Sequence, residues 1–337
     1  MKRFDLAIIG AGPAGYAAAM RALDFGKRVL LVERDRIGGA GIHNGALSSK
    51  TFWEVAQEVA RWRIQNREFD LPEADVSWAD VVAQVDAAVN TRTEQLERHI
   101  IGCNDCEAAE AIVFAMGNGR LEGNHTVAVE HDGNVVRYEA DHVILATGSR
   151  PRRLPNVHID EQVILSSDGI SNLEDYPESL VVLGAGVIGC EFATIFALLG
   201  KTKVFLIDKA ERILPFEDED VVAVVERNLE ANGAVIHRNA SLLRMEVKDG
   251  RVEYELKYKD GHSEVFNVEK ALVSIGREPN TEGLGLETTD VQLTEKGHIL
   301  ELAKDTSTTA SNIYAVGDIT ADIALVNVGR WKGGAMQ

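Results

Sequence analysis

The sequence predicts an α/β protein, because one pattern of a short apolar run, a glycine-rich turn, a helical segment and a second apolar run occurs twice. Both turns have the form G-x-G-x-x-G, at 10–15 and 184–189, and an acidic residue ends each second apolar run. With 337 residues, 45% hydrophobic and 26% charged, the chain is long enough for two domains. Together these observations predict two Rossmann-like dinucleotide-binding domains.

The first unit begins the chain. We expect a strand at 4–9, a helix that closes at Gly26 and a buried second strand at 28–33. Two basic residues precede the first apolar run, but Asp5 and the glycine pattern interrupt the segment that a signal peptide needs. No apolar stretch reaches the roughly 18 uninterrupted residues of a membrane span, so none is expected.

The first glycine-rich turn has a role for each glycine. Gly10 permits the tight turn, Gly12 lets the backbone approach a pyrophosphate, and Gly15 allows the helix to pack closely on the strand. The phosphates then meet the helix N-terminus, where free N–H groups favour anions. Glu33 ends the second strand, where a carboxylate can accept hydrogen bonds from ribose hydroxyls.

The second unit repeats this arrangement. Gly184, Gly186 and Gly189 take the same parts, followed by a helix at 190–200 and a strand at 203–208. The strand ends in an acidic residue, as the first unit does, so both units are predicted to bind a dinucleotide.

The acidic residue of the second unit is Asp208. Its carboxylate would repel a 2′-phosphate, so NAD(H) is preferred there over NADP(H). The adjacent Lys209 weakens this preference without reversing it.

Three further segments complete the pattern. A polar helical region is expected around 51–100, and hairpins are expected at 125–140, turning at Asp132–Gly133, and at 251–268, turning at Asp260–Gly261.

Composition excludes one class of partner and indicates a compartment. The net charge of −18 disfavours nucleic acid, because phosphate backbones are bound by clustered Lys and Arg. Three cysteines give no disulfide framework, which fits a reducing cytoplasm.

Six motifs in one order carry a family resemblance. They are GAGPAG with Glu33, Gly38-Gly39 followed by Ser49-Lys50, VILATGSRPR at 143–152, GAGVIGCE at 184–191, ALVSIGREPNT at 271–281 and IYAVGDIT at 313–320. In this order they resemble the pyridine nucleotide–disulfide oxidoreductases, especially the dihydrolipoamide dehydrogenases and soluble pyridine-nucleotide transhydrogenases. The resemblance implies FAD in the first unit and NAD(H) in the second. It also implies an FAD-binding domain formed by 1–150 and 276–337, with an NAD(P)-binding domain at 151–275 inserted between them.

The resemblance also assigns site residues. It places Lys50 on the flavin N5 side, paired with Glu191, and Asp318 against the ribityl chain. An ammonium near the flavin stabilises negative charge as hydride arrives, and a carboxylate fixes that ammonium. The motifs add these cofactor-binding positions: Pro13, Ala14, Arg34, Gly39, Ser49, Ala146, Thr147, Gly148, Val187, Ile188, Gly276, Arg277 and Gly317. No metal site is predicted.

The loop after Gly38-Gly39 departs from the family. The positions of the redox cysteine pair fall on Gly41 and Ala46, neither of which can form a thiolate or a mixed disulfide. His43 stands where the transhydrogenases tend to carry a histidine, and it is either a structural loop residue or a catalytic residue that handles protons.

A second departure concerns the C-terminal part. The family continues into an interface domain that supplies a His-Glu base and the dimer contact, whereas this chain stops at GRWKGGAMQ. A homodimer is compatible with the sequence if such a domain exists beyond this chain.

Cys103 and Cys106 form a C-x-x-C in an apparent insertion relative to the family. The pair is incidental, redox-active or regulatory, or linked to a metal. Cys190 is best explained as a small apolar helix residue.

These observations predict an FAD-dependent NAD(P)H oxidoreductase that passes hydride from NADH to flavin and then to a non-disulfide acceptor. The acceptor is another pyridine nucleotide, a quinone or dye, or a redox protein. Two alternatives remain open: a non-catalytic module that binds FAD and NAD, and a disulfide reductase that uses Cys103 and Cys106.

Overall fold

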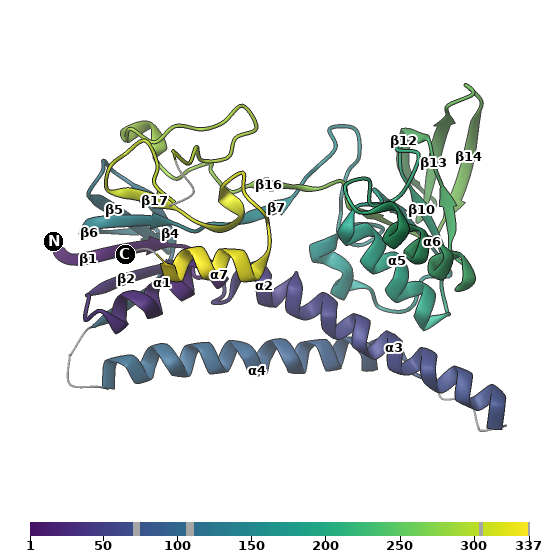
Figure 1. Cartoon of the computed structure of the whole chain (residues 1–337), viewed down its shortest axis with the longest axis horizontal. Coiled ribbons are helices and arrows are strands. Elements are labelled where there is room, and N and C mark those ends of the chain that lie inside the picture. Colours follow the sequence, from purple (N-terminus) through teal and green to yellow (C-terminus); the bar gives the residue numbers. More distant parts are fainter. Residues whose placement is uncertain (70–74, 106–110, 303–305, 336–337) are drawn as a thin grey trace. The chain divides into compact units, whose positions relative to one another are not determined.

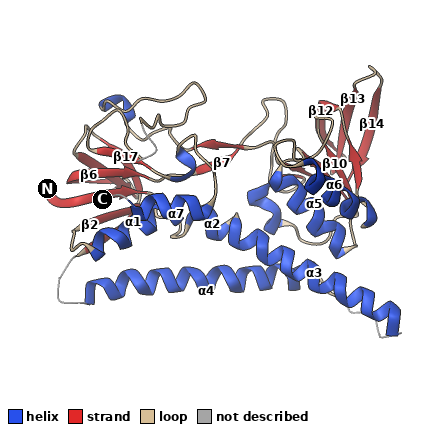
Figure 2. Ribbon diagram, viewed as in Figure 1, coloured by secondary structure: helices blue, strands red, loops and turns tan. Residues whose placement is uncertain are grey.

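The computed structural model describes residues 1–69, 75–105, 111–302 and 306–335 (Figure 1). The helices and parallel strands confirm the predicted α/β fold class (Figure 2). The residues cluster into two compact units. Unit 1 comprises Met1–Ala46, Val89–Arg150 and Glu278–Gln337, and unit 2 comprises Leu47–Ala88 and Pro151–Arg277.

Unit 1 is built on a seven-stranded sheet. Its strands follow the order β3-β2-β1-β6-β5-β4, and β17 pairs with β6. Their bounds are β1 Lys2–Ile9, β2 Val29–Glu33, β3 Ile112–Met116, β4 Asn118–Leu121, β5 Thr126–His131, β6 Asn134–Leu145 and β17 Ile313–Ala315. Because β1 runs parallel to both β2 and β6, the turn after β1 lies at the carboxyl edge of the sheet, between two neighbours.

The helices of unit 1 follow from its sequence pattern. They are α1 Pro13–Asp24, α2 Gly39–His43 and α7 Val326–Ala335, with 3₁₀ turns η2 Leu286–Thr288 and η3 Gly317–Ile319. Helix α1 packs against α7 (Figure 1). All five residues of β2 are buried, which explains why this strand is a continuous apolar run rather than an alternating one.

Two long helices span the boundaries between the units along the chain. Helix α3 covers Ala46–Phe69, and α4 covers Trp78–Asp105. The polar helical region expected around 51–100 is therefore present as two helices. Its first part, Leu47–Ala88, clusters with unit 2.

Unit 2 contains a five-stranded parallel sheet in the order β11-β10-β9-β15-β8, and a three-stranded antiparallel sheet, β12-β13-β14. The strand bounds are β8 Ile164–Ser166, β9 Ser179–Leu183, β10 Lys203–Ile207, β11 Val235–His237, β12 Ala240–Lys248, β13 Arg251–Tyr258, β14 Ser263–Val268 and β15 Lys270–Val273. Its helices are α5 Val187–Leu199 and α6 Glu219–Ala231, with the 3₁₀ turn η1 Ser167–Asn172. A two-stranded sheet of β7 Ser149–Pro151 and β16 Arg277–Pro279 forms where the chain leaves and re-enters unit 1.

Both predicted hairpins are confirmed. In the first, β5 and β6 pair up to His131 and Asn134, on either side of Asp132–Gly133. In the second, β13 and β14 pair across Asp260–Gly261. Asp132 and Gly133 both have positive φ, as an Asp-Gly hairpin turn requires.

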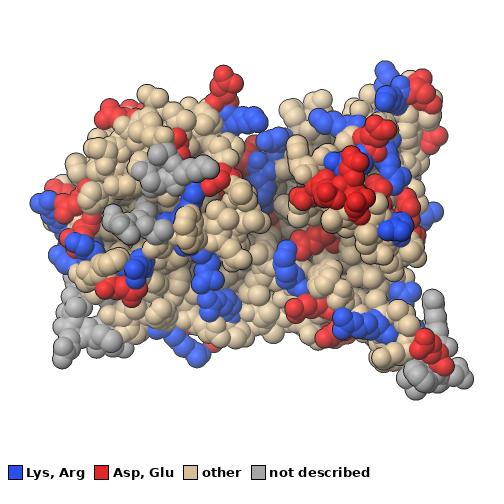
Figure 3. Space-filling model, viewed as in Figure 1, with Lys and Arg blue, Asp and Glu red and all other residues tan. Residues whose placement is uncertain are grey.

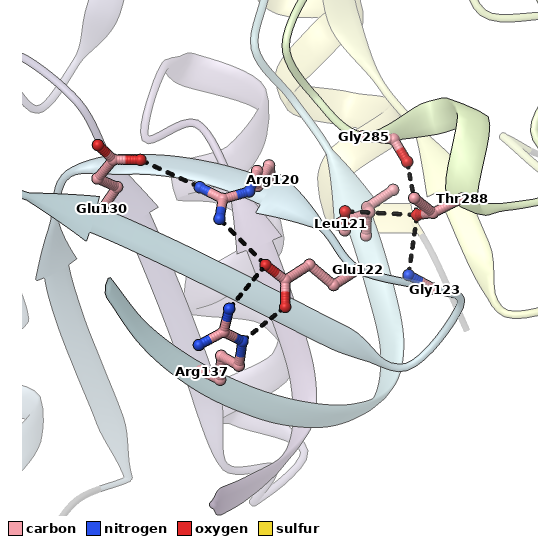
Figure 4. A network of polar contacts seen from close by, with 8 residues as sticks. All are labelled: Arg120, Leu121, Glu122, Gly123, Glu130, Arg137, Gly285 and Thr288. Carbon is pink, nitrogen blue, oxygen red and sulfur yellow. Dashed lines mark hydrogen bonds and ion pairs between the residues drawn. The ribbon is translucent and has the colours of Figure 1, made fainter. Parts of the chain in front are cut away.

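A polar network ties the last segment of unit 1 to β4 (Figure 4). Thr288 accepts a hydrogen bond from the Gly123 amide at 2.9 Å and donates one to the Gly285 carbonyl at 2.7 Å. Beside it, Glu122 bridges Arg120 at 3.0 Å and Arg137 at 2.6 Å. These ion pairs are partly exposed, so we assign them a positioning role with little net stability.

Candidate functional site

The first glycine-rich turn, which lies in unit 1, is tightly packed except at its central glycine. Gly10 has φ +106°, and a Cβ there would overlap the carbonyl oxygen of Ala146. A Cβ on Gly15 would overlap the carbonyl oxygen of Gly10. Around Gly12 no heavy atom lies within 4 Å of the Cβ position, and this N-cap of α1 makes no side-chain hydrogen bond. The free amides and the open space together fit a pyrophosphate, as FAD requires.

Glu33 holds this turn from the neighbouring strand. Its carboxylate accepts hydrogen bonds from the amides of Ala11 at 2.8 Å, Arg34 at 2.9 Å and Asp35 at 3.0 Å. The residue is only 9% exposed. Carboxylate oxygens have capacity for further donors, so a ribose hydroxyl can still bind here. The Arg34 side chain is exposed.

The second glycine-rich turn, in unit 2, repeats the packing of the first. A Cβ on Gly184 would lie 2.6 Å from the Ser274 carbonyl oxygen, and a Cβ on Gly189 would overlap the Gly184 carbonyl oxygen. Around Gly186, the N-cap of α5, the Cβ position again has no heavy atom within 4 Å. Val187 and Ile188 form the first turn of α5.

Asp208 has the same role in the second glycine turn as Glu33 has in the first. Its carboxylate accepts hydrogen bonds from the amides of Ala185 at 2.7 Å and Ala210 at 2.8 Å. The carboxylate after the second strand thus holds the glycine turn in both units, which gives it a structural part in addition to the predicted contact with ribose.

The segments predicted to complete the first cofactor site meet in unit 1. Asp318, in η3, accepts a hydrogen bond from the Ser149 hydroxyl at 2.8 Å. Thr147 donates to the Asn280 carbonyl at 2.7 Å, and the Asn280 amide donates to the Thr147 carbonyl at 2.9 Å. A Cβ on Gly317 would lie 3.3 Å from the Cβ of Ala14. The residues after β6, the segment after β16 and the N-terminal turn of α1 are therefore neighbours.

Gly276 and Arg277 cluster with unit 2. Gly276 has φ +105°, and the Arg277 guanidinium is 3.4 Å from the Asp168 carboxylate. The adjoining Ser274 carbonyl packs against Gly184, so this segment borders the second glycine turn.

Lys50 and Glu191 form an ion pair of 2.8 Å within unit 2. Lys50 lies on α3 with its side chain 61% exposed, and Glu191 lies on α5 with its side chain 18% exposed. The family resemblance predicted this pairing over a separation of 141 residues.

Packing between α3 and α5 sets the geometry of this pair. Trp78 stacks on Phe52 at 5.5 Å and on Phe196 at 5.4 Å between ring centroids, and it is 1% exposed. Farther along α3, Arg63 donates to the Leu198 carbonyl at 3.2 Å. Phe52 is two residues from Lys50, and Phe196 is five residues from Glu191. Through Trp78 the aromatic stack therefore links α3 and α5, the two helices that carry the ion pair.

The loop that lacks the cysteine pair folds as α2 and the start of α3. A Cβ on Gly41 would overlap the ring of Pro13 and lie 3.5 Å from Val326. Ala46 is the first residue of α3. The structure thus leaves no room for a side chain at Gly41 without movement of its neighbours.

His43 is the last residue of α2, and only one of its two ring nitrogens has a hydrogen-bond partner among the described residues. Its Nε2 atom lies 2.9 Å from the Ile37 carbonyl, so Nε2 carries the proton and donates. Its Nδ1 atom is buried and has no hydrogen-bond partner among the described residues. Burial lowers the pKa of His43, which favours the neutral ring.

Of the cysteines, Cys190 is buried and unreactive. Burial raises the pKa of Cys190 to about 12, and its thiol donates to the Ala185 carbonyl at 3.4 Å. Cys103 lies half-buried in α4, and Cys106 lies outside the described residues.

Sequence reasoning missed two supporting residues. Ser149 follows Gly148 inside a quoted motif, but nothing local marks it as the partner of Asp318. Trp78 is the first residue of the polar helix α4, and its aromatic side chain is the local signal of burial. Ser49, predicted at the cofactor site, is 5% exposed in α3, and Gly39 is the first residue of α2.

Two general findings concern the described part of the chain. No group of three or more His, Cys, Asp or Glu side chains there could hold a metal ion, and no helix there is long and apolar enough to cross a membrane. On the face shown in Figure 3, acidic and basic side chains both occur widely.

Known proteins match over nearly the whole chain. A family model described as pyridine nucleotide-disulphide oxidoreductase matches residues 4–333. A dihydrolipoyl dehydrogenase of Bacillus subtilis is 34% identical over 342 residues, which cover 98% of this chain and 70% of that protein. One of Staphylococcus aureus is 31% identical, with 96% of this chain and 67% of that protein covered.

Solved structures agree. LpdA from Mycobacterium tuberculosis has a TM-score of 0.87 and 29% identity, over 100% of this chain and 72% of its own. The HOCl-induced flavoprotein disulfide reductase RclA from Escherichia coli, in its Cu(II) complex, has a TM-score of 0.86 and 26% identity, over 100% of this chain and 70% of its own. The duplicated glycine turns, the segment that carries Asp318 and these matches point to one conclusion. The chain belongs to the pyridine nucleotide-disulphide oxidoreductase family, whose dihydrolipoyl dehydrogenase-like members are FAD-dependent oxidoreductases that use NAD(H).

Proposed function

We propose that this FAD-dependent oxidoreductase takes hydride from NADH and passes the electrons to an acceptor that is not a disulfide. When bound, FAD accepts the hydride and releases its electrons to the acceptor. The observation that carries the proposal is the loop from Gly38 to Ala46, which contains no sulfur.

The packing of this loop supports a direct acceptor. At Gly41, where the disulfide reductases carry a cysteine, the Pro13 ring fills the place of a side chain. Cys190 is buried as a thiol, so it offers no substitute nucleophile. Electrons that leave the flavin must then go to a molecule that reaches it.

In this proposal the two glycine turns hold the nucleotides. Gly12 and Glu33 bind the pyrophosphate and a ribose of FAD, and Asp318 binds its ribityl chain. Gly186 and Asp208 bind the corresponding parts of NAD(H). Both N-cap glycines face open space, which supports this assignment.

Lys50 and Glu191 serve the hydride step. The Lys50 ammonium stabilises negative charge that develops on the flavin, and Glu191 orients the ammonium through their 2.8 Å ion pair. His43, with a proton on Nε2 and a free Nδ1 acceptor, is suited to receive a hydrogen bond from a bound group.

The acceptor is a small molecule or a redox protein. A second pyridine nucleotide, a quinone or dye, and a redox protein all suit a flavin without a thiol relay. The first would make the protein a transhydrogenase, and the second would make it a diaphorase.

Stopped-flow spectroscopy of the FAD-loaded protein tests the proposal. Anaerobic NADH should bleach the flavin band near 450 nm, and a quinone or a pyridine-nucleotide analogue should restore it. Lipoamide and other disulfides should restore it no faster than buffer. An unchanged flavin band would instead identify a non-catalytic module.

A cysteine variant separates the remaining alternative. Cys103→Ser should leave all of these rates unchanged. Disulfide-dependent reoxidation that is lost in Cys103→Ser would refute the proposal and support disulfide reduction by the C-x-x-C. The variant pair Gly41→Cys and Ala46→Cys should fail to create lipoamide turnover, because Gly41 lacks room for a side chain.

A further inference from the structure

Unit 2 contains a titratable group that the proposed function does not use, the imidazole of His237. This residue is the last of β11, at the edge of the parallel sheet. Its ring packs against three aromatic rings, one each from β10, β13 and β14. The ring centroids lie 6.2 Å from Phe205, 6.2 Å from Tyr258 and 5.2 Å from Phe266. His237 therefore lies where the parallel and antiparallel sheets of unit 2 meet.

The hydrogen bonding of this ring favours its neutral form. Nδ1 lies 2.8 Å from the Tyr258 hydroxyl, and Nε2 is buried with no hydrogen-bond partner among the described residues. A neutral ring can carry its proton on Nδ1 and donate it to Tyr258, whereas a protonated ring also has an N–H on Nε2 without an acceptor. Burial accordingly lowers the pKa of His237.

The carboxylates near the ring do not reverse this preference. Glu264, on β14, favours the proton on His237, but burial outweighs it, so the pKa of His237 is still lowered. On α6, Glu226 and Glu230 are both paired with Arg238, the residue after His237. Neither of these two carboxylates is therefore available as a partner for the protonated ring.

The cations around the aromatic cluster oppose a further positive charge. Lys203 lies over the Phe205 ring at 5.3 Å, and His262 stacks on Tyr258 at 4.4 Å between ring centroids. Three more lysines line a cavity together with Tyr258: Lys209, Lys257 and Lys259. Like charges disfavour protonation of a neighbouring histidine.

The main chain of His237 connects this cluster to the second glycine turn. Its carbonyl accepts a hydrogen bond from the Asp208 amide at 3.0 Å. The Asp208 carboxylate in turn accepts one from the Ala185 amide, inside the turn, at 2.7 Å. A shift of β11 that moves a protonated ring toward water therefore acts on the residue that holds the turn.

We propose that His237 is a pH-sensitive switch for nucleotide binding at the second glycine turn. With a neutral ring the two sheets stay packed and Asp208 holds the turn. Protonation loosens this packing and weakens nucleotide binding, so binding at mildly acidic pH releases a proton. This inference rests on the proposed function, in which the second glycine turn holds NAD(H).

Calorimetric binding of ADP-ribose to the FAD-loaded protein tests the inference. ADP-ribose has the pyrophosphate and both riboses of NAD(H) but no nicotinamide, so it cannot reduce the flavin. Its affinity should fall about three- to tenfold from about pH 7.5 to about pH 5, because it scales with the fraction of protein whose His237 is neutral. Near pH 6, titrations in buffers of different ionisation enthalpy should show release of up to about one proton per ADP-ribose bound.

Two variants assign the proton to His237. His237→Asn retains a polar group for the Tyr258 hydroxyl, and His237→Phe retains the aromatic packing, but neither side chain titrates in this range. In both, the affinity for ADP-ribose should vary by less than about twofold over the same pH range, without proton release. The control is His158→Asn, which removes an exposed histidine from the same unit and should keep the wild-type pH profile.

Three results would overturn the inference: wild-type affinity that does not change with pH, proton release that persists in the His237 variants, or no binding of ADP-ribose. Failure of the proposed function has a different signature. In that case NADH leaves the flavin oxidised, although ADP-ribose still binds with release of a proton.

Discussion

Replacing two glycines of the second turn by alanine, one at a time, should change different properties: Gly189→Ala should lower stability, and Gly186→Ala should weaken NADH binding. Gly189→Ala places a methyl group against the Gly184 carbonyl oxygen and 2.7 Å from Ser274 Oγ. Gly186→Ala places the same group in open space, with no heavy atom within 4 Å. The two variants therefore separate the packing of the turn from its exposure to a ligand.

The expected magnitudes follow from these contacts. Overpacking against rigid backbone costs about 1–3 kcal/mol or more, and alanine in a helix regains about 1 kcal/mol over glycine. We expect Gly189→Ala to lower the unfolding free energy by about 2 kcal/mol. At Gly186, φ −77° and ψ −171° suit alanine. The poorer N-cap costs about 0.5–1 kcal/mol and the reduced entropy of the unfolded chain returns about 0.4–1 kcal/mol, so stability should change by about 0.5 kcal/mol or less.

Urea unfolding followed by circular dichroism measures the stability difference, and titration with NADH measures affinity. The added methyl at Gly186 blocks the approach of a pyrophosphate, so NADH affinity should fall by at least about tenfold, or about 1.4 kcal/mol. FAD content should stay at the wild-type level in Gly186→Ala, because the first turn is unchanged. Wild-type NADH affinity in Gly186→Ala, or wild-type stability in Gly189→Ala, would refute this reasoning.

Three further outcomes are expected. Lys50→Gln should slow flavin reduction by NADH on the order of 10- to 100-fold in stopped flow. The unfolding free energy of this variant should change by less than about 1 kcal/mol, because the lysine side chain is 61% exposed. Glu191→Gln should slow flavin reduction less than Lys50→Gln does. The lowered pKa of His43 means that the unfolded chain binds the proton more readily, so this residue's contribution to stability is present above about pH 6.5 and is lost as pH falls. Urea midpoints of His43→Gln between pH 7.5 and pH 5 should thus decline less than those of the wild type, and an equal decline would contradict the assignment. Tyr254→Phe should be neutral or stabilising by up to about 1 kcal/mol in the same assay, because the tyrosine hydroxyl is buried without a partner within the described residues; a loss above about 1 kcal/mol would indicate a hidden partner.

The local part of the fold could be predicted from the sequence. The glycine turns, their flanking strands and the two Asp-Gly hairpins each depend on residues close together in the chain. The ion pair of Lys50 and Glu191 was also predicted, but through the family resemblance, since nothing local links residues 141 positions apart.

The features that could not be predicted from the sequence depend on tertiary packing. The segment Leu47–Ala88 has the composition of a solvated helical region, yet Trp78 and Phe52 bury their rings against α5 and draw it into unit 2. Lys257 and Lys259 likewise have the pattern of an exposed hairpin edge. Only the pairing of β12 with β13, beside the end of β10, brings them near Lys209.

The carboxylates of Glu33 and Asp208 have a consequence for how cofactors come and go. Each carboxylate accepts a hydrogen bond from a backbone amide inside its glycine turn, Ala11 for Glu33 and Ala185 for Asp208. These bonds hold the turn in one conformation whether or not a nucleotide is bound. The conformational entropy of this loop is lost during folding, not at the moment of association. The binding site is therefore preorganised: a cofactor binds to a turn that is already formed, and the turn keeps its backbone conformation when the cofactor dissociates.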